Sequence, residues 1–428
     1  MTPFSELVDL PNVPPALPLL LNEIIRGKTW KESRKRIKDM MMTLREQSEG
    51  YAYGDALTMS YNDDPAIFNV HLHGALDLLS GAGCMSPECR INSAKRLASS
   101  IGLIADRVWL SDTLSSRFIN FGRITNAKLD EIISDVLVLS ELFPLIKDGI
   151  VRFSPPVRPT CTSCIETFDE QVLDISQSVA HVFRRDFRIK SQSDGGYSIY
   201  TGKCFEPPLI MTSVDDSLND VPPLKIYTRN TAYNEINSIL WSAREASISK
   251  GSILSNSRIA LSGLLHQEGR LLDRRNLLFL DNEREFSIPW VAELSPSQII
   301  ELRYEVSKTL PLLRALLAKS MAYSDTNITQ PNSIIDQLKY QAEEVRTELE
   351  LKKQNSFRLW RTTYSILGLG LSAYGVTTQQ IPAAIGGLLP IINLLITHKT
   401  NQHSEMSKLL TRPGYVLVKA KDILTHSH

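Results

Sequence analysis

Residues 86–110, SPECRINSAKRLASSIGLIADRVWL, contain the pattern that decides the fold. The first seventeen of them predict an amphipathic helix that ends at Gly102, because glycine commonly closes helices. ADRVWL follows as a short apolar run with the length of a buried strand. The same order returns downstream, where Thr125 or Asn126 caps a helix and IVRF, residues 150–153, forms a second strand. Alternating helices and strands predict a small, partly parallel sheet with helices packed on it.

A β-hairpin is predicted near residues 186–201, where two alternating runs flank the turn sequence Ser-Asp-Gly-Gly. From Asn230 onward the helical period dominates, and Ser295, Pro296 and Gln298 form a strong helix start. The predicted fold class is therefore mixed α/β and predominantly α. It combines a small, partly parallel sheet with helices in the N-terminal half, the hairpin, and an all-helical C-terminal half.

The 428 residues are enough for two or three hydrophobic cores. We expect a zinc-stapled α/β domain at 1–185 and a connector of hairpin and loops at 186–228. A helical domain at 229–361 and an apolar helical hairpin with a C-terminal cap at 362–428 would follow.

Two further helices are predicted before residue 80. Thr29 and Glu32 form a capping box at the start of the first. The second is predicted near residues 65–79, where His71 and His73 would not share a helix face. Both histidines are therefore interpreted as structural.

Four of the five cysteines occur in two pairs, Cys84 with Cys89 and Cys161 with Cys164. Each pair lies in a turn just before a predicted helix. If the two predicted strands are parallel neighbours, both helix N-termini lie at one end of the sheet, and four thiolates there suit a tetrahedral Zn²⁺. The free N–H groups of helix N-termini also favour thiolates. We therefore expect a structural zinc site made by these four cysteines.

Two other interpretations of the cysteines stay open. In the first, all four are ordinary inert thiols. In the second, Cys161 and Cys164 form a redox-active pair or a disulfide. Cys204, in the loop after the hairpin, is expected to take no part in the zinc site or in either alternative.

Basic and acidic residues balance at 47 each, which removes any overall electrostatic bias toward nucleic acid or an anionic membrane. Within the basic stretch 26–38, Lys31, Lys35 and Lys38 share one side of the predicted helix and are candidate phosphate contacts. A solvated helix face is the alternative that the balanced charge favours. The N-terminus has no basic region before a long apolar run, and cysteines are few, so the expected location is the cytoplasm.

Residues 362–397 contain no Lys, Arg, Asp or Glu and divide into two short apolar stretches. Two helices in a hairpin fit this segment better than one span, because a spanning helix needs about 20 apolar residues. The hairpin is expected to lie either in the protein core or in the cytoplasmic face of a membrane, where the basic flanks would suit it. A soluble part followed by such a hairpin is similar in outline to bacterial self-killing and phage-defence effectors.

The chain has no GxSxG elbow, no GxxxxGK[ST] phosphate loop and no HExxH motif. The sequence therefore predicts a bacterial, non-enzymatic interaction or sensor protein with structural zinc and a protein partner, in a defence or stress system. One alternative is a membrane-acting effector that uses the 362–397 hairpin. The other is an enzyme with an unrecognised site near the cysteines.

Overall fold

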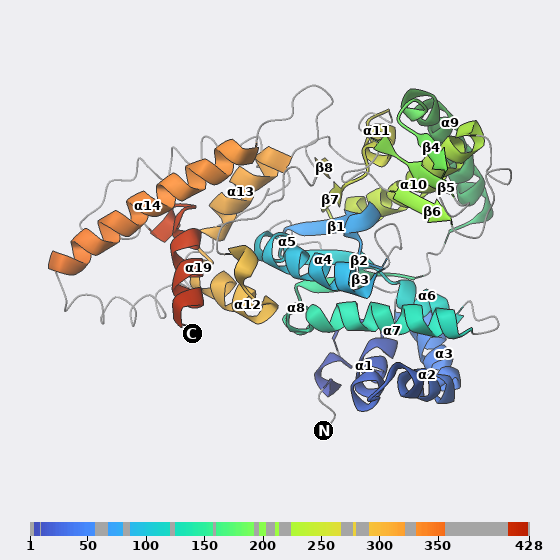
Figure 1. The fold of residues 1–428 in the computed structure, drawn as a ribbon, viewed down its shortest axis with the longest axis horizontal. Helices are drawn as coiled ribbons and strands as arrows, with labels where there is room; N and C mark the ends of the chain where they lie inside the picture. The colour runs from blue at the N-terminus through green and yellow to red at the C-terminus, as the bar shows by residue number, and fades with distance from the viewer. Residues whose placement is uncertain are drawn as a thin grey trace.

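The computed structural model describes residues 4–8, 10–55, 67–79, 86–119, 125–156, 160–191, 197–202, 210–213, 224–266, 277–279, 291–321, 331–355 and 410–426. At its centre lies a five-stranded sheet with the strand order β3-β2-β1-β7-β8 (Figure 1). Its strands are β1 (Asn69–His73), β2 (Arg107–Ser111), β3 (Val151–Ser154), β7 (Ser252–Ser255) and β8 (Leu277–Phe279). All neighbouring strands are parallel.

The central strand β1 is buried along its whole length. It pairs with β2, where Val70 lies opposite Val108, and with β7, where His73 lies opposite Ser255. Strands covered on both faces are typical of parallel sheets, because the crossover helices lie on either side.

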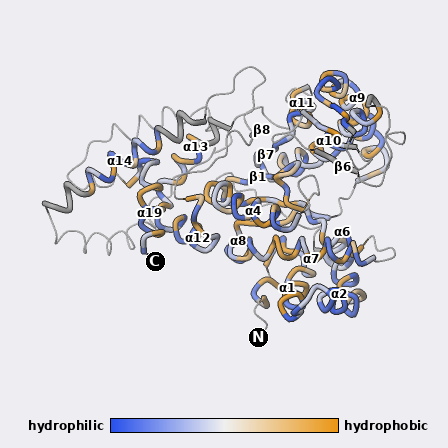
Figure 2. The backbone as a smooth tube through the Cα atoms, in the orientation of Figure 1, coloured by the Kyte–Doolittle hydropathy of each residue, from blue (hydrophilic) through white to orange (hydrophobic). Residues whose placement is uncertain are grey.

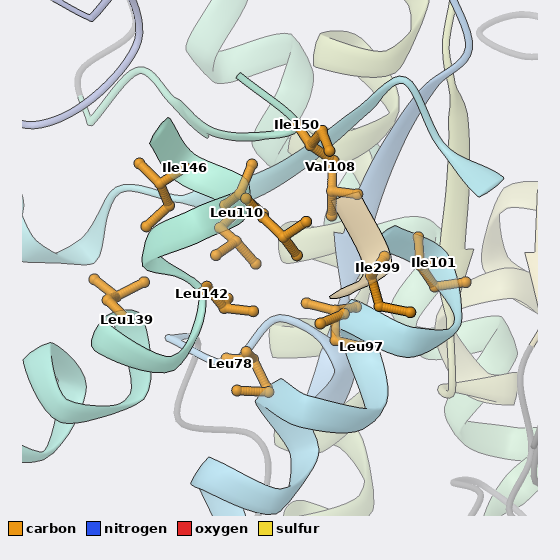
Figure 3. Packing of buried hydrophobic residues seen from close by; sticks show 14 of the residues in the cluster. Leu78, Leu97, Ile101, Val108, Leu110, Leu139, Leu142, Ile146, Ile150 and Ile299 are labelled. Carbon is orange, nitrogen blue, oxygen red and sulfur yellow. The ribbon is translucent and has the colours of Figure 1, made fainter. Parts of the chain in front are cut away.

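One face of the sheet packs against the first two crossovers, which contain α4 (Pro87–Ser99), α5 (Ile101–Ile104), α7 (Asn126–Glu141) and α8 (Phe143–Lys147). Figure 3 shows Val108 and Leu110 of β2 among Leu97, Ile101 and Leu142 from these crossovers. Their apolar stripes recur at helical spacing, so burial of this face explains why these segments are helices.

The opposite face packs against α10 (Leu224–Ile248) and α11 (Arg258–His266), and α9 (Thr162–Phe183) packs on these two helices. Ile253 of β7 enters this second hydrophobic cluster with Ile236 and Ile239 of α10. Next to it, a separate antiparallel sheet has the order β4-β5-β6. Its strands are β4 (Arg188–Ser191), β5 (Tyr197–Tyr200) and β6 (Ile210–Ser213).

Two helical groups surround this α/β core (Figure 1). The N-terminal group packs against α7 and contains α1 (Ala16–Arg26), α2 (Trp30–Asp39), α3 (Met41–Gly50) and α6 (Thr113–Ile119). The C-terminal group contains α12 (Pro296–Glu305), α13 (Leu310–Met321), α14 (Pro331–Asn355) and α19 (Tyr415–His426). Arg303 of α12 donates to the carbonyl oxygens of Gly102, Leu103 and Ala105, just before β2, so this group attaches near the amino end of that strand.

The predicted fold class is confirmed: the protein is mixed α/β and predominantly helical, with a small parallel sheet and a separate antiparallel hairpin. Two details of the prediction are wrong. The segment near 65–79 contains β1 instead of a helix, and β7 and β8 interrupt the half of the chain predicted to be all-helical. Strand pairing also joins segments on both sides of the predicted 186–228 connector, while the domain limits themselves stay a prediction.

Candidate functional site

The strand order defines where a ligand site is expected. From β1 the chain continues to β2 and β3 on one side, and it then returns to β7 on the other side of β1. The carboxyl ends of β1 and β7 are therefore neighbours at a topological switch point. In open parallel sheets, ligands bind outside the carboxyl ends of the strands at such a point.

His73, the last residue of β1, is only 2% exposed. Its Nδ1 lies 2.9 Å from Ser255 Oγ at the end of β7. Its Nε2 is buried and has no hydrogen-bond partner among the described residues. Burial lowers the pKa of His73 to about 3, so the imidazole is neutral at physiological pH. Buried polar atoms without a hydrogen-bond partner are uncommon in folded proteins, so this nitrogen calls for an explanation.

Gly74 and Asn256 connect the segments that follow the two strands. The Asn256 side chain accepts the backbone N–H of Ala75 at 2.9 Å. Gly74 has a φ of 68°, which glycine adopts at low cost. A Cβ on Gly74 would lie 2.5 Å from Asn256 Oδ1. Only glycine therefore allows this close approach.

Ser257 extends the network to α10. Its N–H donates to Ser255 Oγ at 3.0 Å, and its own Oγ accepts the Ala260 N–H at the start of α11. The Glu235 carboxyl of α10 is hydrogen-bonded to Ser257, and burial raises the pKa of Glu235 to about 7. The Oε2 of Glu235 is buried and lacks a hydrogen-bond partner in the described part of the chain.

These contacts make one polar chain from His73 through Ser255 and Ser257 to Glu235, and at each end a buried atom has no partner within the described part of the chain. We name it, with the adjoining Gly74 and Asn256, the switch-point cluster. With a neutral imidazole, an amide, hydroxyls and a carboxyl that is half-protonated near pH 7, the cluster offers hydrogen bonds with little fixed charge.

Two aspartates occupy the same edge of the sheet. Asp77 accepts the N–H groups of Leu79 at 3.2 Å and of Ser111 at 3.1 Å. Asp112 directly follows β2 and accepts the Ser115 N–H at 2.9 Å, whereas its Oδ2 is buried without a partner among the described residues. Burial raises the pKa of each carboxyl to about 6.

Sequence reasoning placed His71 and His73 on a helix and so missed the site. On a strand, residues two apart share a face, and both side chains are buried. The Ser249 hydroxyl donates its hydrogen to the Ala246 carbonyl. Its oxygen therefore accepts a hydrogen bond from His71 Nε2, 2.8 Å away. It also stacks on Trp109 with ring centroids 5.7 Å apart. The structural interpretation thus fits His71, whereas His73 Nε2 has no hydrogen-bond partner among the residues that the structure describes.

The polar residues after β7 were also missed. SILS, residues 252–255, is a short buried run that ends in Ser255, and Asn256 and Ser257 follow it directly. An apolar run that ends in small polar residues is the signal that would have found them, since strand ends at a sheet edge carry the polar contacts.

The described cysteines lie at helices of two different hydrophobic clusters, one on each side of the sheet. Cys89 lies in α4, whereas Cys161 is the N-cap of α9 and Cys164 lies in its first turn. All three are exposed. Cys84 and Cys204 lie outside the described residues. Within the described ranges there is no group of three or more potential metal ligands, and the four-cysteine zinc site stays a prediction.

The Cys161 and Cys164 thiols are hydrogen-bonded to each other. This contact, with backbone N–H groups of the first turn, lowers the pKa of Cys161. The same contact raises the pKa of Cys164. The positive charge of Arg244 on α10 acts in the opposite direction and lowers it.

The basic stretch forms α2, which Figure 2 shows as mainly hydrophilic. Its predicted N-cap, Thr29, is confirmed. Arg34 forms two hydrogen bonds of 2.6 Å with Asp130 of α7, and Lys38 donates to Asn126 at 3.0 Å. Of the three candidate anion contacts, Lys31 and Lys35 are exposed on this helix, and Lys38 already has a protein partner.

The predicted apolar hairpin at 362–397 lies outside the described residues, and so does its expected membrane contact. Among the helices that the structure describes, none combines the length and the apolar character that crossing a membrane requires. Comparison with models of protein families, with curated proteins and with solved structures gives no match to this chain.

Glu235 makes stability depend on pH. Its pKa is raised from an ordinary 4.5 to about 7 in the folded protein, so its contribution is present below pH 4.5 and is lost as the pH rises through 7. We expect Glu235→Gln to reduce the fall in unfolding free energy between pH 5 and 8 by on the order of 2 kcal/mol. Urea unfolding at four pH values measures this. Glu343→Gln, at an exposed position of α14, is the control; equal pH profiles for the two variants would contradict the prediction.

Proposed function

We propose that the protein is a sensor that binds a small, hydroxyl-rich ligand of the nucleoside or nucleotide class at the switch-point cluster. One observation carries this proposal. The strand order brings the ends of β1 and β7 together. The polar chain at that place contains His73 Nε2 and Glu235 Oε2, which are buried and have no hydrogen-bond partner in the ranges that the structure describes. The proposal keeps the sensor function expected from the sequence and gives it a location.

The chemistry of the cluster favours hydroxyl and amide groups on the ligand. His73 is neutral, and Asn256 and the serines carry no charge. Glu235, with a pKa of about 7, is able both to donate and to accept a hydrogen bond near neutral pH. A site of this kind loses affinity for a ligand that lacks the matching polar groups, because its own buried atoms then stay unpaired.

The position of Asp112 supports the choice of ligand class. In sheets with this strand order that bind dinucleotides, an acidic residue in the region of the second strand's carboxyl end accepts hydrogen bonds from the ribose hydroxyls. Asp112 follows β2 directly and has a buried oxygen without a partner among the described residues. This step is an analogy at the level of the fold.

The test is isothermal titration calorimetry of the full chain with adenosine, ATP, NAD⁺ and, as hydroxyl-bearing controls, ribose and glucose. We expect at least one nucleoside-containing probe to bind more tightly than either sugar. His73→Gln should weaken that binding about tenfold or more, the effect of losing one buried hydrogen bond.

His71→Gln is the matched control, since it changes the same residue type on the same strand and face. The His71 ring is already hydrogen-bonded to Ser249 and stacked on Trp109. Its loss should therefore lower the stability of the fold and leave the affinity for the probe unchanged. Asp112→Asn should weaken a ribose-bearing probe as well. Equal affinity of the His73→Gln and His71→Gln variants, or binding of none of the probes, would overturn the proposal.

A further inference from the structure

We propose that Cys161 and Cys164 are a reversible dithiol–disulfide couple at the N-terminus of α9. This inference is independent of the ligand site. It concerns a motif that the proposed function does not use.

The geometry suits a disulfide within one helical turn. Cys161 is the N-cap residue of α9, with extended backbone angles, and Cys164 occupies the third helical position. Their thiols are already in hydrogen-bond contact. Residues three apart at a helix start have Cα atoms roughly 5 to 6 Å apart, within the range that disulfides span. Bond formation therefore needs little movement of the backbone.

The surroundings suit thiolate chemistry. Cys161 is the N-cap residue of α9, and the backbone N–H groups of Ser163 and Cys164 in the first turn have no carbonyl partner inside the helix. Both side chains are exposed, so a soluble disulfide can reach them. Exposed cysteines at a helix N-terminus in a Cys-X-X-Cys motif are the setting in which reactive thiols occur.

Arg244 of α10 places a positive charge beside the cysteine pair. Its Nη1 donates to Thr160 Oγ1, next to Cys161, at 3.3 Å, and its charge acts on Cys164. The guanidinium also lies 5.4 Å from the Trp241 ring centroid, and that ring contacts Phe168 of α9 at 4.5 Å. Phe168 lies one helical turn beyond Cys164. The pair is thus held against α10, the helix that carries Glu235.

The reaction is ordinary thiol–disulfide exchange with a low-molecular-weight disulfide as the oxidant. The Cys161 thiolate attacks one sulfur of the oxidant, forms a mixed disulfide and releases the first thiolate, which takes up a proton. The Cys164 thiol loses its proton and attacks the Cys161 sulfur, which closes the ring and releases the second thiol. The protein loses two electrons and two protons, and one disulfide becomes two thiols.

The test uses the full chain, purified under reducing conditions and assayed for metal content. The protein is then equilibrated with mixtures of reduced and oxidised glutathione, quenched by alkylation and mapped by peptide mass spectrometry. We expect a Cys161–Cys164 disulfide that disappears again in excess reduced glutathione. Cys164→Ser should trap a mixed disulfide of glutathione on Cys161, and Cys161→Ser should abolish the intramolecular bond.

Cys89→Ser is the matched control, because Cys89 is also exposed and also lies in the first turn of a helix. This variant should leave the couple unchanged. The proposal is overturned if Cys161 and Cys164 stay reduced in oxidised glutathione alone. It is also overturned if the purified chain carries one Zn²⁺ per molecule that both Cys161→Ser and Cys89→Ser remove, since the cysteines then form the predicted zinc site.

Discussion

Replacing Asp135 with asparagine should destabilise the protein by about 3 to 5 kcal/mol, the usual effect of removing one partner from a buried ion pair. The Asp135 carboxylate is fully buried on α7 and forms an ion pair with Arg90 of α4, which is 6% exposed. Arg90 also donates to Ser134 Oγ at 3.1 Å and to the Leu78 carbonyl at 2.7 Å. Asparagine keeps the shape of the side chain and leaves the guanidinium without its counter-charge.

The position of this ion pair explains the expected size of the effect. Arg90 holds together α4, α7 and the segment after β1 that leads to the candidate site. Arg117 of α6 approaches the other Asp135 oxygen to 2.9 Å. Burial raises the pKa of Asp135 even though both arginines lower it, so keeping this carboxylate ionised in the core is costly. Without it, Arg90 loses its counter-charge, and Arg117 keeps its ion pair with Glu131.

Urea unfolding of the full chain measures the effect. Asp130→Asn is the control, because Asp130 lies on the same helix and also pairs with an arginine, Arg34, but both side chains are about one third exposed. An exposed pair contributes about 0 to 1 kcal/mol. Adding Arg90→Met to Asp135→Asn should recover at least about 1 kcal/mol, because the unpaired charge is then removed. Equal effects of the Asp135 and Asp130 variants would contradict this account.

Replacing Asp106 with alanine should cost about 2 to 4 kcal/mol and detach the C-terminal helices first. Asp106 accepts two hydrogen bonds from Arg314 of α13, one of them at 2.9 Å, and lies 3.6 Å from Arg303 of α12. It also accepts the Phe68 N–H at 2.9 Å, just before β1. The expected cost lies below that of a fully buried pair because the Asp106 side chain is 29% exposed.

Hydrogen exchange of the full chain tests the order of events, since local opening increases exchange in the segment that detaches. Amides of α12 and α13 should lose protection more than those of β1 and β2. Asp148→Ala is the control, because Asp148 accepts a hydrogen bond from Tyr304 of α12 at an exposed position. A uniform loss of protection across both groups would show that Asp106 stabilises the whole fold instead of one attachment.

Local signals made most helices predictable. Thr29, Thr125 and Ser295 are the N-caps that the sequence indicated, and Ser295 forms the full capping box with Gln298. These interactions are made within four residues, so no distant part of the chain is needed to recognise them. The strands β2 and β3 were predicted for a similar reason, because each is a short apolar run after a helix stop.

The strands β1 and β7 were missed because their residues suit a strand only when buried in a sheet. NVHLH alternates polar and apolar side chains, and its polar members are satisfied by partners far along the chain, such as Ser249 for His71. SILS has four residues and follows a long helix, too little for a periodic pattern. Both segments therefore became strands through pairing with each other.

The candidate site depended on the same pairing. His73 and Ser255 are 182 residues apart in the chain, and Glu235 reaches them from a third segment. No spacing rule links these positions, whereas the two-residue spacing of Cys161 and Cys164 was visible at once. Motif spacing finds sites built on one turn and misses sites built across a sheet edge.

The sequence by itself determined the helical segments with their caps, the alternation of helices and strands in residues 86–154, the hairpin and the cysteine pair. Each of these depends on interactions between residues close together in the chain. The tertiary structure alone decided the strand order, the return of the chain to β7 and the convergence of His73, Ser255 and Glu235. Those features depend on contacts between buried surfaces that lie far apart in the chain. The free energy of these contacts is gained only when the sheet is assembled.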